Sequence, residues 1–397
     1  MIKPELCIRC RGAKYLCGLS YCPILVKSKV VRVHNKEIYG SSPPTIFVGR
    51  SNYPKLTVYP SAPPIVGDTG KFEDPKYWLI SDLNEFLTMR LSLIRGGVRY
   101  DINAAKNPNK ILLDIQIMSL SARPVDVELK LVKPPSGGIL DDNTPPLGPS
   151  APLEKLNITT SPSPLRVTEK VYSDTDMKAV EGILRLYKAG LDVEKISRIL
   201  SVGALGHFRK LVPTRWSITA VDKSISDFLI EKIKTYDTID KVEVYFRKFQ
   251  RNLFVAILIP KEWSFEWGEA WFPGSTWNKW GNYVDVEVDN EGYFGRTDYP
   301  EIGGCYYASR LGVTEFLESR RKQATAILWR EIYEGFNLPI GVWFVRENIR
   351  ELFKAKPIIF EDLSSALNFV KKLLRIDLKL WLRKSILSYN TIDKWLK

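Results

Sequence analysis

The spacing of apolar residues predicts strands throughout the chain. Segments that are short and continuously apolar, or that alternate apolar with polar residues, lie at 45–50, 111–119, 125–131, 242–248, 253–259, 283–289 and 341–345. Segments 111–119 and 125–131 are predicted to pair with each other. The short connection Gln250-Arg251-Asn252 predicts a hairpin between 242–248 and 253–259.

Apolar residues spaced three and four apart predict helices between these strands. The predicted helices cover residues 83–93, 173–190, 192–203, 225–233, 314–333 and 361–387. Ser81, Asp192 and Asp222 are expected to cap the helices that follow them, and Gly96-Gly97 is expected to end the first. The fold class predicted from these patterns is mixed α/β (α+β), with a large body of helices and mostly antiparallel sheet.

A proline-rich stretch divides this body. Residues 134–165 contain eight prolines and show neither helical nor strand periodicity, so they form either a linker or an ordered loop over a site. The predicted organisation is therefore 1–40, a basic cysteine-rich segment; 41–133, the first part of the body; 134–165, the proline-rich segment; 166–387, the second part of the body; and 388–397, an exposed C-terminal peptide.

Positive charge is concentrated at the two ends of the chain. The formal net charge is +13, and residues 1–40 and 346–397 each contribute +6 of it. Basic ends attract polyanions, although they can equally serve only to keep the ends solvated. No apolar run approaches the roughly 18–20 residues that span a bilayer, so we expect a soluble, cytoplasmic protein.

Four cysteines near the N-terminus are the clearest chemical signal. Cys7, Cys10, Cys17 and Cys22 lie within sixteen residues. Four thiolates can hold one Zn²⁺ in closed tetrahedral coordination, which would make the site structural rather than catalytic. An iron–sulfur cluster or two disulfides would use the same residues. The first residues are polar and basic and lack the apolar region of a secretory signal, which argues against disulfides.

A second candidate site combines cations with an aromatic residue. Its members are Arg50, Arg209, Lys210, Arg215 and Trp216. Guanidinium groups can bind phosphate and an aromatic face can stack on a base, so these residues are candidates for binding an anion or a nucleotide. The alternative interpretation makes Trp216 a core residue and the cations ordinary surface residues.

Three carboxylates share one face of the predicted strand at 283–289. Period-two spacing places Asp285, Glu287 and Asp289 together. They could hold Mg²⁺ for phosphodiester hydrolysis, but the solvated face of an edge strand is the favoured interpretation.

Several sequence phrases resemble the archaeal Nre family of DNA-repair proteins. They are the cysteine block, Phe47-Val-Gly-Arg50, the segment 210–222 and the segment 303–310, and they are spread over nearly the whole chain. The resemblance implies an N-terminal zinc finger with Zn²⁺ as its cofactor, a role in repairing DNA damage, and docking on the sliding clamp PCNA. It implies no particular reaction, so whether the protein is an enzyme stays open.

The last residues match most of a clamp-binding peptide. In such a peptide three apolar side chains form a plug for a pocket on the clamp, and Ile392, Trp395 and Leu396 supply them here. Tyr389 stands where the family pattern has Gln. We therefore expect a DNA-binding repair protein that docks on PCNA. The alternative is an enzyme that processes nucleotides or nucleic acid with the central cations.

Overall fold

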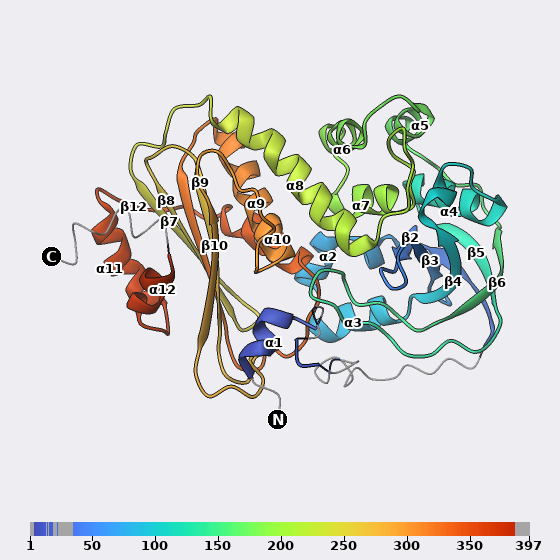
Figure 1. The fold of residues 1–397 in the computed structure, drawn as a ribbon, viewed down its shortest axis with the longest axis horizontal. Coiled ribbons are helices and arrows are strands. Elements are labelled where there is room, and N and C mark those ends of the chain that lie inside the picture. Colours follow the sequence, from blue (N-terminus) through green and yellow to red (C-terminus); the bar gives the residue numbers. More distant parts are fainter. Residues whose placement is uncertain (1–3, 13, 15, 19–21, 23–34, 386–397) are drawn as a thin grey trace. The chain divides into compact units, whose positions relative to one another are not determined.

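The computed structural model describes residues 4–12, 14, 16–18, 22 and 35–385. The chain forms two compact units: unit 1 comprises Met1–Val26 with Ser226–Lys397, and unit 2 comprises Lys27–Ile225. Each unit contains one six-stranded sheet with helices packed against it (Figure 1). The predicted α+β class is confirmed.

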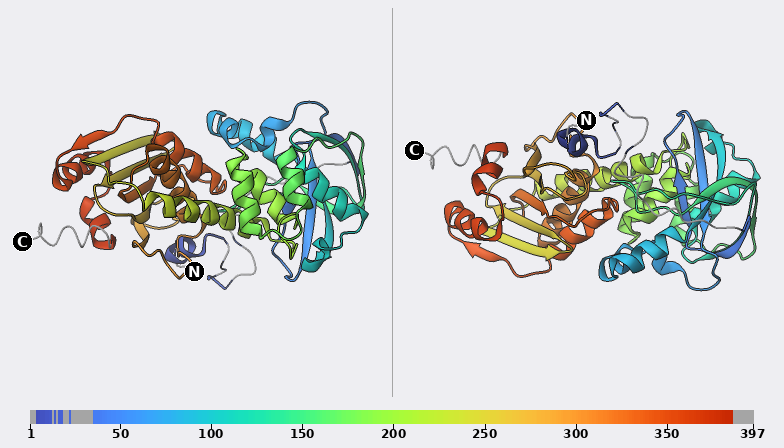
Figure 2. Two further views of the ribbon diagram at one scale, coloured as in Figure 1. Left: turned by 90° about the horizontal axis from the view of Figure 1, so that it is seen from above. Right: turned by 90° about the horizontal axis from the view of Figure 1, so that it is seen from below.

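Unit 2 is organised around the sheet β1-β5-β6-β4-β3-β2, in which only β4 and β6 pair in parallel among the described strands. Its strands are β1 (Glu37–Ser42), β2 (Thr45–Val48), β3 (Lys55–Ala62), β4 (Ile94–Asp101), β5 (Val125–Leu131) and β6 (Ser150–Ile158). Its helices are η2 (Gly70–Glu73), α2 (Pro75–Ile80), α3 (Leu83–Leu91), η3 (Ile102–Ala105), α4 (Lys110–Leu120), α5 (Arg166–Ser173), α6 (Ala179–Lys188) and α7 (Val193–Ser201), and α8 (Thr214–Ile233) starts here. Helices α4 and α7 pack on the edge strand β2, and Figure 2 shows these helices beside the strands from two sides.

Unit 1 is organised around the sheet β10-β9-β11-β8-β7-β12, in which β9 and β11 are the parallel pair among the described strands. Its strands are β7 (Val242–Phe249), β8 (Asn252–Ile259), β9 (Ser264–Trp271), β10 (Asp285–Glu291), β11 (Thr325–Ile332) and β12 (Ile358–Phe360). Its helices are α1 (Pro4–Cys10), α9 (Gly304–Arg320), α10 (Trp343–Leu352), α11 (Leu363–Leu373) and α12 (Leu378–Lys384). Helices α9 and α10 cover one face of the sheet, and α11 and α12 cover the other (Figure 1).

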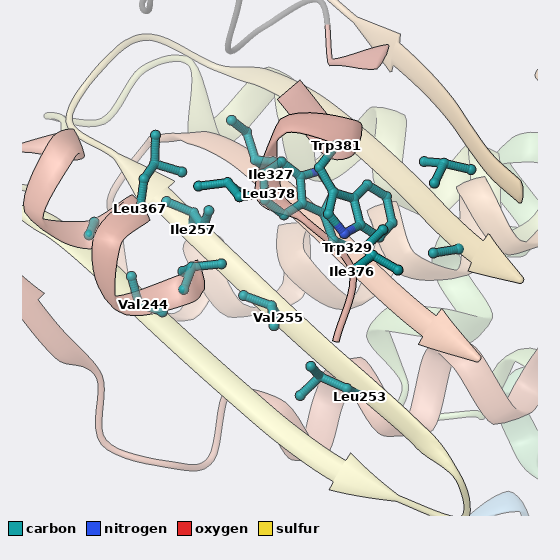
Figure 3. Close-up of a cluster of buried hydrophobic side chains, with 14 of the residues drawn as sticks. Val244, Leu253, Val255, Ile257, Ile327, Trp329, Leu367, Ile376, Leu378 and Trp381 are labelled. Atoms are coloured by element: carbon teal, nitrogen blue, oxygen red, sulfur yellow. The ribbon is translucent and has the colours of Figure 1, made fainter. Parts of the chain in front are cut away.

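The core of unit 1 lies between its sheet and helices α11 and α12. Alternate residues of β8, including Val255 and Ile257, face these helices, and Trp381 of α12 stacks on Trp329 of β11 with ring centroids 5.0 Å apart (Figure 3). The intervening residues of β8 face α9 and α10, where Phe254 contacts Phe344. Strands covered on both faces are apolar at nearly every position, which explains the continuous run in β8.

Several local predictions are confirmed. Strands β2 and β5 occupy their predicted positions, and Asp192 caps α7 by accepting a hydrogen bond of 2.6 Å from the Lys195 N–H. The hairpin β7–β8 turns at Gln250 and Arg251, whose φ angles of 42° and 60° are those of a type I′ turn. These features depend on a few neighbouring residues, so the sequence alone predicts them.

Four segments have a different structure from the one predicted. Residues 111–119 belong to helix α4 rather than a strand, and 341–345 lead into helix α10. The predicted helix 314–333 is instead the end of α9 followed by strand β11, and 361–387 contains two helices rather than one. Segments that are buried all round show no clear periodicity, so strand and helix are easily confused there.

Three predicted helix boundaries are also wrong. Ser81 ends α2, and Asp82 caps α3 by accepting hydrogen bonds from the Asn84 and Glu85 N–H groups. Gly96 and Gly97 lie inside strand β4, and the helix assigned to Asp222 starts earlier, at Thr214. In β4 the backbone at Gly96 packs closely, since a Cβ there would come within 2.5 Å of Leu153 Cδ1 and would force that side chain to shift.

The proline-rich residues 134–165 lie inside unit 2. Ile139 pairs with Leu147 in an isolated bridge, Ser136 pairs with Ser150, and β6 follows directly. Residues 388–397 lie outside the described part of the chain. Within that part, no helix combines the length and the apolar character needed to cross a membrane.

Candidate functional site

The four N-terminal cysteines are free thiols on and just after helix α1. Cys7 and Cys10 are one helical turn apart, and Gly12 and Gly18 have φ angles of 67° and 77°, which glycine adopts without strain. Burial, together with charge on Cys22, Cys10 and Cys17, raises the pKa of Cys7 to about 11.

The donor set of this segment suits a soft metal ion. Four sulfurs that influence one another electrostatically are the ligands that Zn²⁺ prefers in closed structural sites. Among the described residues, however, no group of three or more His, Cys, Asp or Glu side chains is already arranged to hold a metal. The residues therefore match zinc in their chemistry, and metal binding would have to draw the sulfurs closer together.

Helix α1 is held against the sheet of unit 1 by a buried arginine. The Arg11 guanidinium donates to Glu287 and forms ion pairs with Glu269 and Glu287, both at 2.9 Å. It also lies over the ring of Trp271, and Ile8 packs with Trp271 in the same cluster. A fully buried cation needs such partners, so Arg11 fixes the place of the cysteine segment.

The carboxylates of β10 lie on an edge strand, as predicted, but they are not all solvated. Glu287 pairs with Arg11, and Asp289 pairs with Arg296 and accepts the Ile302 N–H at 2.8 Å. Burial raises the pKa of Asp285 and of Glu287, although Arg11 opposes the shift at Glu287. Two of the three carboxylates thus balance arginines.

The structure brings Arg50, Arg215 and Trp216 to one side of unit 2. The Val48 N–H donates to the Thr214 hydroxyl at 2.8 Å, so the end of β2 lies beside the start of α8. The side chain of Trp216 is 47% exposed, which overturns the alternative that it is a core residue. Arg215 forms an ion pair with Asp141, with distances of 3.1 and 2.9 Å to the two carboxylate oxygens.

The other two predicted cations are used differently. Arg209 donates to the backbone carbonyl of Tyr172 and lies over its ring, 4.7 Å from the centroid, so it ties the segment after α7 to helix α5. The next residue, Lys210, is exposed. Among the described residues, neither side chain forms a hydrogen bond, an ion pair or a ring contact with Trp216.

A buried ionic cluster in unit 2 was not predicted from the sequence. Glu73 accepts hydrogen bonds from Thr45 at 2.7 Å, from Arg198 at 2.6 Å and from Arg90. Burial alone would raise the pKa of Glu73, but the guanidinium groups of Arg90 and Arg198 hold it below its usual value. A carboxylate this deeply buried stays charged because two cations compensate it.

These contacts close into a ring around the end of α7. Arg90 also donates to the carbonyl of Pro146 at 3.1 Å, while at the other end of the same segment Asp141 binds Arg215. The hydroxyl of Thr214, the residue before Arg215, accepts a hydrogen bond of 3.4 Å from the hydroxyl of Ser201. Ser201 lies one turn of α7 after Arg198. We call this set of contacts the Glu73 ring; its members are Glu73, Arg90, Pro146, Asp141, Arg215, Thr214, Ser201 and Arg198.

Polar atoms on or next in sequence to members of the Glu73 ring lack hydrogen-bond partners within the described structure. They include Asn143 Oδ1, Thr144 Oγ1, Ser197 Oγ and Arg198 Nε, all on buried residues. Nearby, burial lowers the pKa of Lys195 to about 7, and the positive charge of Arg198 contributes. An unpaired buried polar atom costs about 1–3 kcal/mol, so this region is held at a cost in stability.

One sequence signal could have revealed the Glu73 ring. Helix α7 repeats polar residues at Glu194, Ser197, Arg198 and Ser201, a spacing that makes one stripe, while its apolar residues Val193, Ile196, Ile199 and Leu200 predict burial. All nine residues of α7 are buried, so the stripe faces other protein groups. Its partner Glu73 is 125 positions away from Arg198, and no local pattern links them.

Helices α11 and α12 are held by two buried carboxylates. Glu331 of β11 accepts the N–H groups of Arg375 at 2.9 Å and of Ile376 at 3.2 Å between the two helices. Glu266 of β9 accepts the hydroxyl of Ser385 at 2.6 Å. Ser385 is the last described residue, so the predicted clamp-binding residues Tyr389, Ile392, Trp395 and Leu396 follow a fixed point on the sheet but themselves lie outside the described residues.

Known proteins match nearly the whole chain. A family model described as Archaeal Nre, N-terminal, matches residues 16–278, and one described as Archaeal Nre, C-terminal, matches residues 291–395. No solved structure matches.

Three relatives carry DNA-repair names. DNA repair protein NreB of Archaeoglobus fulgidus is 48% identical over 382 residues, which is 96% of each chain. DNA repair protein NreA of the same organism is 36% identical over 384 residues, 94% of this chain and 95% of the relative. NreA of Haloferax volcanii is 36% identical over 371 residues, 90% of this chain and 87% of the relative. The resemblance found in the sequence phrases is confirmed, and the chain belongs to the archaeal Nre family.

Proposed function

We propose that this protein acts in DNA repair in the cytoplasm, binds DNA, and docks on the sliding clamp PCNA through its C-terminal residues. The observation that carries the proposal is the 48% identity, over 96% of both chains, to a protein named for DNA repair.

Features of the chain support the two interactions. Its net charge of +13 favours a polyanion such as DNA, whose phosphates release counterions when Lys and Arg bind them. The clamp-binding segment begins four residues after Ser385, which is hydrogen-bonded to Glu266.

We further propose that Cys7, Cys10, Cys17 and Cys22 hold one structural Zn²⁺. Support comes from four free sulfurs on a segment that Arg11 and Ile8 fix to the sheet. The metal would hold the segment closed and would take no part in a reaction, because four protein ligands leave no open position.

Clamp docking is tested with purified full-length protein and immobilised PCNA. We expect the double variant Ile392→Ala with Trp395→Ala to lose at least about tenfold in affinity, because both side chains belong to the apolar plug. The matched control is Thr391→Ala with Lys394→Ala, which changes neighbouring residues outside the plug. Equal binding by both double variants would refute clamp docking through this segment.

Zinc binding is tested by metal analysis of the same protein. We expect about one zinc per chain, and loss of that metal in Cys10→Ser, whereas Cys305→Ser should keep it because Cys305 is buried within α9 and does not belong to the four-cysteine segment. Iron with visible absorbance would instead indicate a cluster, and protein free of both metals would contradict the proposal.

A further inference from the structure

We infer that Tyr53 and Trp216 form a stacking site for the unpaired bases of single-stranded nucleic acid. Tyr53 lies in the turn between β2 and β3, and Trp216 lies in the first turn of α8. Their ring centroids are 5.6 Å apart, and their side chains are 55% and 47% exposed. This inference rests on the proposed DNA binding and names the form of DNA and the site.

It is unusual for two aromatic rings to contact each other while both remain exposed to solvent. Single exposed aromatics are common on protein surfaces, but rings from separate elements normally meet in the core, where burying each is worth about 1.5–3 kcal/mol. Here the rings meet while about half of each side chain stays accessible. Every base has a π face that can cover such rings, and stacking is worth about 1–3 kcal/mol per base.

The backbone around the pair is held in place. The Val48 N–H donates to the Thr214 hydroxyl, which joins the end of β2 to the start of α8, five residues before Tyr53 and two residues before Trp216. Within the hairpin, the Gly49 N–H donates to the Thr57 carbonyl at 2.9 Å and the Lys55 N–H donates to the Asn52 carbonyl at 2.8 Å. A ring pair fixed before binding loses little entropy when a base stacks on it.

The charges beside the rings suit a nucleic-acid backbone. Arg50 and Lys55 are on the two sides of Tyr53 in the hairpin, and Arg215 directly precedes Trp216. Asp141 balances Arg215, and Lys55 is exposed in the hairpin. An apolar protein partner would not need these cations, whereas phosphates would bind them.

The geometry also favours single strands over duplex. Bases in a duplex are stacked on one another and show only their edges, so they cannot cover exposed rings unless the duplex opens. A strand with unpaired bases can place its bases on Tyr53 and Trp216 while its phosphates contact Arg50 and Lys55. Damaged or partly opened DNA provides such strands.

Fluorescence anisotropy with a labelled oligothymidine and a duplex of equal length tests the site. We expect Tyr53→Ala and Trp216→Ala each to lower affinity for the single strand by roughly tenfold, with a smaller effect on the duplex. Trp216→Phe should retain most of the affinity because it keeps an aromatic face. Tyr39→Ala, in β1 of the same unit and also exposed, is the matched control and should bind as wild type does.

The outcomes separate this inference from the proposed function. If wild-type protein binds DNA and both alanine variants bind the single strand equally well, the stacking site is wrong and DNA binding stands. If wild-type protein binds neither probe, the proposed DNA binding itself fails, and the site with it. If the alanine variants lose only PCNA binding, the rings serve a protein partner and the inference is overturned. Unchanged melting temperatures would show that the variants are folded.

Discussion

The two units bury polar groups in different ways. In unit 1, buried charges such as Glu331 and Glu266 accept hydrogen bonds from groups on the helices that cover the sheet. In unit 2, the Glu73 ring surrounds buried oxygen and nitrogen atoms that have no partner among the described residues, such as those of Thr144 and Ser197. Unit 1 also has buried atoms without a hydrogen-bond partner among the described residues, such as Trp267 Nε1 and Trp271 Nε1. The units therefore differ in where such atoms occur: in unit 2 several of them belong to residues 143–144 and to α7.

In unit 1 the sheet supports the helices packed on it, whereas in unit 2 buried charge is concentrated in the Glu73 ring. The sheet of unit 1 is covered by apolar side chains on both faces, and its polar groups fix the positions of α1, α11 and α12. In unit 2, buried atoms without a hydrogen-bond partner among the described residues occur on residues 143–144 and on α7, the helix that carries Arg198 of the Glu73 ring. Unused capacity of this kind lowers stability and commonly marks regions selected for something other than stability.

The largest expected effect on stability concerns the core between the sheet of unit 1 and helix α12. Trp381→Ala should lower the free energy of unfolding by about 3–5 kcal/mol, because it empties the space over Trp329 in a fully buried core. Leu380→Ala, on the exposed side of the same helix, should change it by less than about 0.5 kcal/mol. Denaturant unfolding of both variants measures the difference, and equal effects would show that α12 does not close the core.

The next effect concerns the Glu73 ring. Glu73→Gln should cost on the order of 3 kcal/mol, because a neutral amide leaves the Arg90 and Arg198 cations buried without a counter-charge. The pKa of Glu73 is lowered in the folded protein, so its contribution is fully present above pH 4.5 and is lost as the pH falls below that value.

Unfolding measured across this pH range checks the prediction for Glu73. The difference between wild type and Glu73→Gln should therefore shrink in acid. The exposed Glu169→Gln, also in unit 2, serves as the control and should be close to neutral at every pH. A difference independent of pH would mean that Glu73 stabilises by packing rather than by charge.

The smallest effect has the opposite sign. Thr144→Val and Ser197→Ala should each raise the free energy of unfolding by up to about 1 kcal/mol, because each removes a buried oxygen that has no partner in the described structure. Ser217→Ala is the contrasting variant, since its hydroxyl contacts Ser201 at 2.7 Å and Thr214 at 2.9 Å, and it should lower stability. Destabilisation by the first two variants would show that water or a ligand satisfies those oxygens.

Much of the local structure could be predicted from the sequence. The cap at Asp192 and the hairpin at residues 249–252 depend on contacts between residues a few positions apart. Helix α4 could have been recognised from Asn109, whose side chain accepts the Leu112 N–H at 3.0 Å, but its apolar run was interpreted as a strand. When a segment is buried on several sides, its apolar residues no longer show the spacing that distinguishes a helix from a strand.

The candidate site was predicted only in part. The side-chain chemistry of Arg50, Arg215 and Trp216 predicted a shared binding site. The fold places these residues on one side of unit 2. Tyr53 was not chosen, because nothing in a Tyr-Pro turn indicates that its ring will meet that of a residue more than a hundred positions later.

The amino-acid sequence by itself determined the four-cysteine spacing, the terminal apolar peptide, the charged ends and the family phrases, because each is a property of neighbouring residues. The tertiary structure alone decided that Glu73 would join Arg90 and Arg198, and that Tyr53 would meet Trp216. Such pairs form only when strands and helices distant in the chain pack together. Packing depends on the shape and burial of whole elements, which a short stretch of sequence does not specify.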